Sequence, residues 1–182
     1  MKNIRKIALY MMLGFAVLGG LFIGGTSLSD PGGLRGILWT GAWLFPMVIG
    51  SWLAWRRPRI AFPLLLMWSM GILGLLIWQA IAPDWWRTVI NSNGPIITIA
   101  IFALSVPLTI YGYQRRTRFV SLILIGMPVL SALAASNTSD NDHAPIFHGG
   151  SGMAIGLPVF TAGVLYLIAS FVDKRDDISD EK

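Results

Sequence analysis

The chain has 182 residues, of which 54% are hydrophobic and 13% are charged, and its mean hydropathy is +0.64. A soluble domain carries about 25% charged residues, so this composition excludes a soluble enzyme domain and indicates a membrane protein. The net charge of +5 comes from basic residues clustered between apolar runs, which favours lipid headgroups over nucleic acid as their partner. The chain has no Cys, which excludes disulfides and thiol catalysis.

Six uncharged apolar runs approach or exceed the length of about 20 residues that a helix needs to cross a bilayer. They are 7–25, 37–55, 60–82, 96–113, 119–135 and 154–172. The runs are apolar on every side, which favours helices over a barrel of alternating strands. We therefore expect an all-α integral membrane protein, a bundle of six transmembrane helices. It would form a single domain over 1–172, followed by a short cytoplasmic tail at 173–182.

The first run follows three basic residues and could also be the apolar region of a signal peptide. It is longer than the usual region of about 7 to 15 residues, so we expect a retained helix. Ala16, Gly20 and Gly24 recur every four residues along it and form a ridge of small residues. Such a ridge lets another backbone approach closely, either within the fold or from a partner, and it predicts a helix-docking surface.

Basic residues predict the orientation, because positively charged loops stay on the cytoplasmic side. Of the 14 Lys and Arg residues, only Arg35 and Arg87 fall on the side opposite to the N-terminus. We expect a multi-pass protein of the cell membrane with both termini in the cytoplasm. The short loops are typical of a bacterial protein.

The basic turn at 56–59 recurs at 115–118, a shift of 59 residues that the starts of the spans also follow. The shift suggests three hairpin repeats of about 59 residues, as found in transporters. Six evenly spaced helices would give the same period without any duplication.

Tryptophan and proline mark the spans where a ligand pocket is expected. Pro46, Pro107 and Pro128 lie deep enough to kink their helices and open room between them. The pocket candidates, which could equally pack against lipid or another helix, are Trp43, Trp52, Trp68 and Gln79.

The six runs contain no Asp, Glu, Lys, Arg or His. Proton relays and ion pathways place such groups at membrane depth, so their absence argues against proton-coupled transport and acid-base catalysis. We expect no enzyme, no catalytic residue and no cofactor.

The last outer loop brings Asp140, Asp142, His143 and His148 together within nine residues. These side chains are weak candidates for a metal site, because their spacing matches no coordination geometry, and a plain polar loop is the alternative. Just after them, Gly149-Gly150-Ser151-Gly152 resembles the G-x-S-G motif of rhomboid proteases. That family pairs its serine with a histidine on a later span, and no histidine follows Ser151, so we expect no catalytic pair.

Two functions fit this sequence. The first is an accessory or assembly subunit that acts through another membrane protein, because catalytic machinery is missing and Gly20 and Gly24 offer a docking ridge. The alternative is a binding or transport subunit for a neutral or amphipathic small molecule. In size and topology the chain is similar to the substrate-binding subunits of energy-coupling-factor transporters, whose first helix docks a partner through small residues.

Overall fold

The computed structural model describes residues 2–29, 34–82, 96–115, 118–136 and 151–179, with side chains described for 3–21, 41–82, 97–115, 118–134 and 155–172. All regular secondary structure in these residues is helical, which confirms the all-α prediction. The helices are α1 (Lys2–Ser29), α2 (Leu34–Arg56), α3 (Pro58–Ile81), α5 (Ile96–Arg115), α6 (Arg118–Ser136) and α7 (Ser151–Ser179).

Several of these helices have the length and composition of membrane spans. Four segments within the described side chains qualify, namely Asn3–Leu21, Pro58–Ile81, Ile97–Arg115 and Ile155–Val172. A shorter apolar segment, Arg118–Ala134, belongs to α6. The structure thus supports the prediction of a membrane protein with transmembrane helices.

The boundary between α2 and α3 is a very tight turn. The Arg57 amide donates to the carbonyl of Leu53 at 2.8 Å, and the Ala61 amide donates to the carbonyl of Arg57 at 3.0 Å. Pro58 opens α3, a position where its missing N–H costs nothing. The two outer ends differ from the expected spans, since α1 begins at Lys2 and α7 continues to Ser179, through most of the tail 173–182.

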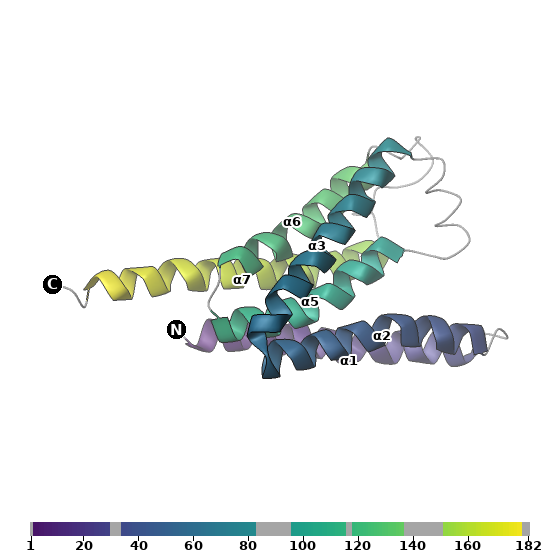
Figure 1. The fold of residues 1–182 in the computed structure, drawn as a ribbon, viewed down its shortest axis with the longest axis horizontal. Coiled ribbons are helices and arrows are strands. Elements are labelled where there is room, and N and C mark those ends of the chain that lie inside the picture. The colour runs from purple at the N-terminus through teal and green to yellow at the C-terminus, as the bar shows by residue number, and fades with distance from the viewer. Residues whose placement is uncertain (1, 30–33, 83–95, 116–117, 137–150, 180–182) are drawn as a thin grey trace.

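Successive helices alternate in direction (Figure 1). The start of α1, the α2–α3 turn, the end of α5, the start of α6 and the end of α7 therefore all lie toward the left of that view. Toward the opposite end, α3 and α6 diverge from α1 and α2. All the basic turns seen in the sequence consequently share one end of the fold.

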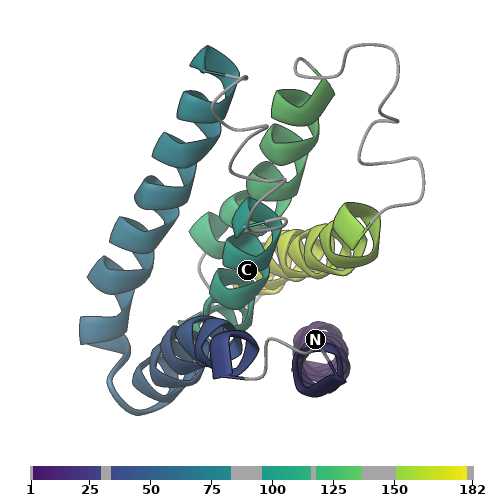
Figure 2. The same cartoon turned by 90° about the vertical axis from the view of Figure 1, so that its right-hand side faces the viewer.

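The central helix is α5, which packs against α1, α2, α3, α6 and α7. In its apolar segment 78% of the residues are buried, against 28% in α3. Figure 2 shows α3 standing at the edge of the molecule. Phe62 lies near the N-terminal end of α3 and contacts aromatic rings on α5 and α6. The Phe62 ring stacks on Tyr111 with a centroid distance of 5.7 Å, and it packs edge-on with Phe119 at a centroid distance of 5.8 Å.

Candidate functional site

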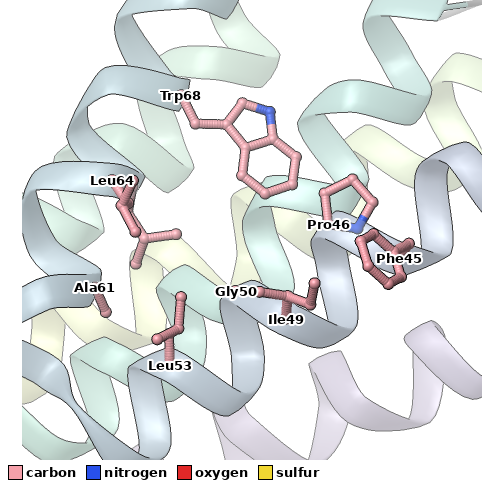
Figure 3. A pocket seen from close by; sticks show the side chains of 9 residues that line it. Phe45, Pro46, Ile49, Gly50, Leu53, Ala61, Leu64 and Trp68 are labelled. Atoms are coloured by element: carbon pink, nitrogen blue, oxygen red, sulfur yellow. The ribbon is translucent and has the colours of Figure 1, made fainter.

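An apolar cleft lies between α2 and α3, beside the turn that joins them (Figure 3). Its volume is about 380 Å³. The α2 wall is formed by Phe45, Pro46, Ile49, Gly50 and Leu53. The α3 wall is formed by Ala61, Leu64, Leu65 and Trp68. Within each wall the residues recur at three- and four-residue intervals, so each helix presents a single face to the cleft.

Gly50 makes the close packing beside this cleft possible. A Cβ atom at Gly50 would lie 3.3 Å from Cβ and Cγ of Pro107 on α5 and 3.7 Å from Cζ3 of Trp68. The missing side chain at position 50 therefore relieves crowding against Pro107, whereas the distance to the Trp68 ring is that of an ordinary contact. In Figure 3 the Trp68 ring projects from α3 toward Pro46 and Gly50. The indole thereby closes the end of the cleft that lies away from the turn.

The cleft is open on its outer side. Phe45, Ile49 and Leu64 line it and yet are exposed. In a bilayer this opening would face lipid. A molecule could therefore enter the cleft from the membrane without a rearrangement of the helices.

The cleft offers mainly apolar contact, because none of its lining residues has a charged side chain and the indole N–H of Trp68 is their one polar side-chain group. Acid-base chemistry has no group to use here. Lipid tails are as apolar as Leu, so burial in this cleft gains little over burial in lipid. Shape, or a polar group held outside the cleft, would have to select an occupant.

Basic residues occupy the turn beside one end of the cleft. Arg56, Arg57 and Arg59 are exposed there, while Leu53 and Ala61 mark the end of the cleft closest to them. The end of α5 is tied to the same place, since Gln114 Nε2 donates to the carbonyl oxygen of Trp55 at 3.2 Å.

A buried tyrosine links α7 to α5 at the same end of the fold and lies near α1. Tyr166 Oη donates to the carbonyl of Thr109 at 2.8 Å. Arg5 and Tyr113 lie close enough to Tyr166 to act on it electrostatically. Only 6% of Arg5 is exposed. Arg5 lies outside the expected run 7–25, but α1 begins at Lys2 and its apolar segment Asn3–Leu21 includes this residue.

The four predicted pocket residues are not brought together. Trp68 lines the cleft, whereas Trp43 is half-buried against the core. Trp52 lies on α2 with 57% of its surface exposed. Gln79 is buried on α3, roughly 16 Å along the helix from Trp68 at 1.5 Å per residue.

The predicted docking ridge on α1 is divided between two environments. Ala16 is buried in the core, whereas a Cβ at Gly20 would meet no atom within 4 Å. Gly24 is on α1, but position 24 falls outside the described side chains. Among the glycines of α1 with described surroundings, Gly19 meets another helix, since a Cβ there would lie 3.1 Å from the Phe102 ring of α5.

The outer loop with the metal candidates Asp140, Asp142, His143 and His148 lies outside the described residues. Elsewhere, among residues that the structure does describe, no group of three His, Cys, Asp or Glu side chains is suited to a metal ion. Ser151 of the G-x-S-G motif is the first residue of α7.

Sequence patterns reveal only part of the cleft. Pro46 stands out by its kink and Trp68 by its depth, but Gly50 and the aliphatic wall residues have no distinctive local pattern. One sequence pattern does point to the α2 wall of the cleft, because Pro46 and Gly50 are four residues apart and share a helix face. Arg5 and Tyr166 were also missed, since pairing between α1 and α7 cannot be deduced from local pattern.

Comparison with known proteins gives no assignment. No family model matches the chain, and neither the curated proteins nor the solved structures give a match.

Proposed function

We propose that the protein is a noncatalytic, multi-pass membrane protein that binds an apolar or amphipathic molecule in the cleft between α2 and α3. The observation that carries the proposal is the cleft itself, with two apolar walls, an open outer side and one end closed by Trp68. This observation favours the binding role over the accessory role that the sequence alone put first.

The proposal includes six spans, both termini in the cytoplasm and residence in the cell membrane of a bacterium. The hairpins α1–α2, α3–α5 and α6–α7 would be the three repeats. Support for the orientation comes from the exposed basic side chains at one end of the fold. Those within the described side chains are Lys6, Arg56, Arg57, Arg59, Arg115 and Arg118.

A titration with dibromostearate, a fatty acid whose bromine atoms quench tryptophan on contact, tests the binding role. In detergent, the acid should quench the fluorescence of the wild type saturably, and Trp68→Phe should lose the saturable part. Filling the cleft with Ile49→Phe and Leu64→Phe should abolish saturation. The matched control, Leu75→Phe with Ile77→Phe, adds the same bulk at exposed positions farther along α3 and should keep it. Equal quenching of the filled variant and the wild type would contradict the proposal.

An accessory role is the second candidate, and one observation favours it. The open space at Gly20 leaves that part of α1 accessible to the backbone of another helix. Replacing Gly20 and Gly24 by Leu should then release a stoichiometric partner while the protein still folds. Gly14→Leu is the control, because position 14 is equally open but lies on a different side of α1. A double variant that retains every partner of the wild type would remove this candidate.

A further inference from the structure

We propose that the occupant of the cleft is one acyl chain of an anionic phospholipid, whose phosphate is held by Arg56, Arg57 and Arg59 at the α2–α3 turn. The inference rests on the proposed binding function and names the class of ligand. The lipid would belong to the membrane leaflet on the side of the protein that carries the basic turns.

The depth of the cleft fits one leaflet. Trp68 closes the cleft ten residues after Pro58, which is roughly 15 Å along α3 at 1.5 Å per residue. The hydrocarbon core of a bilayer is about 30 Å thick. The distance from the turn to the indole is therefore about half of the core, the depth that an acyl chain of a single leaflet reaches.

The charge at the mouth fits a phosphate. The residues Arg56, Arg57 and Arg59 are all exposed. Guanidinium groups bind phosphate oxygens in a two-pronged geometry, and each basic side chain near a membrane surface attracts anionic lipid. Since apolar burial alone discriminates poorly within a membrane, the headgroup would supply the selectivity.

The second basic turn gives an internal comparison. Arg115 and Arg118 repeat the charge pattern at the α5–α6 connection, but α5 and α6 are packed closely there. A Cβ at Gly112 of α5 would lie 2.9 Å from Val120 Cγ1 of α6. The Arg118 guanidinium lies over the Phe171 ring, with Cζ 5.2 Å from its centroid. Similar charge is thus present at both turns, but the apolar hollow between α5 and α6 has a volume of only about 10 Å³, against about 380 Å³ for the cleft between α2 and α3.

Lipid nanodiscs allow a direct test. Acyl-brominated phosphatidylglycerol or phosphatidylcholine is mixed at equal bromine content into unlabelled phosphatidylcholine. The contribution of Trp68 is the difference between the wild type and Trp68→Phe. We expect phosphatidylglycerol to quench this contribution at about fivefold lower lipid fraction than phosphatidylcholine. A variant with Gln at Arg56, Arg57 and Arg59 should lose the preference, and a matched variant with Gln at Arg115, Arg116 and Arg118 should keep it.

The outcomes separate this inference from the binding role. Equal quenching by the two lipids in the wild type would overturn the anionic selectivity and leave a cleft that still accepts acyl chains. No quenching of Trp68 by either lipid would overturn both proposals. If the two Gln variants lost the preference for phosphatidylglycerol equally, the proposed site at the α2–α3 turn would be wrong. The preference would then come from general attraction between the basic end of the protein and anionic lipid. Raising the salt concentration on the wild type must weaken the preference for phosphatidylglycerol, and this measurement depends on no variant.

Discussion

The Tyr166 hydroxyl donates a 2.8 Å hydrogen bond to the carbonyl oxygen of Thr109, and both residues are buried. This bond links the last helix to the central helix α5. Burying a hydroxyl without a hydrogen-bond partner costs free energy, so the bond to Thr109 favours this packing of α7 against α5. The same residue lies near Arg5 of α1, so three helices meet around it.

Tyr166→Phe should lower the free energy of unfolding by about 0.5 to 1.5 kcal/mol, because it removes one hydrogen bond and leaves the ring in place. Unfolding in mixed micelles of mild detergent and dodecyl sulfate would measure this change in the free energy of unfolding. Tyr10→Phe is the control, since Tyr10 is exposed on α1 and its hydroxyl should contribute nothing measurable. Equal stability of the two variants would show that the bond to Thr109 does not stabilise the fold.

Gly163→Ala should destabilise the contact between α6 and α7 by about 1 to 3 kcal/mol. A Cβ at position 163 would lie 2.8 Å from Ile125 Cγ1 and 3.0 Å from the Ile125 amide nitrogen, so backbone would have to move. Gly71→Ala is the matched control, because a Cβ there meets nothing within 4 Å. That variant should be neutral or more stable by up to about 1 kcal/mol, the helix-propensity gain of Ala over Gly. Thermal unfolding of the two variants side by side decides between these outcomes.

Ser51→Ala should leave stability unchanged or raise it by up to about 1 kcal/mol. The Ser51 Oγ atom is buried on α2, and it has no hydrogen-bond partner in the part of the chain that the structure describes. Ser69→Ala is the comparison, because Ser69 Oγ donates to the Leu65 carbonyl at 2.7 Å and its loss should cost about 0.5 to 1 kcal/mol. A large loss of stability in Ser51→Ala would reveal a partner for this hydroxyl.

Single cysteines test the orientation without background labelling, because the chain contains none. With a membrane-impermeant maleimide, Asp142→Cys should react in intact cells, whereas Arg57→Cys should react only after permeabilisation. The wild type serves as the unlabelled control. The reverse pattern would invert the proposed topology, as the basic turns would then face outward.

Sequence reasoning found the helices more readily than their packing. The expected spans 60–82, 96–113 and 119–135 lie within one or two residues of α3, α5 and α6, because Arg and Pro at the turns interrupt long apolar runs. Which helix is central could not be deduced from apolarity, since lipid is as apolar as a protein core. Small and hydroxylated residues are the better signal, and α5 has buried Ala100, Ser105 and Thr109.

The cleft was harder to foresee than the helices. Trp68 could be selected as a deep aromatic residue, but nothing in the sequence distinguishes it from Trp52, which is exposed. In the structure Trp68 faces α2, and a Cβ at Gly50 would lie 3.7 Å from its ring and 3.3 Å from Pro107 of α5. That relationship joins three helices and exists only once they have packed.

Native mass spectrometry of the protein released from nanodiscs tests the lipid-binding cleft most directly. From equal amounts of phosphatidylglycerol and phosphatidylcholine, the wild type should retain one phospholipid per chain, enriched in phosphatidylglycerol. The variant with Ile49→Phe and Leu64→Phe should retain none, and the control with Leu75→Phe and Ile77→Phe should match the wild type. Release of a lipid-free wild type, or equal retention by the filled variant, would contradict the assignment of the cleft between α2 and α3 as a lipid-binding site.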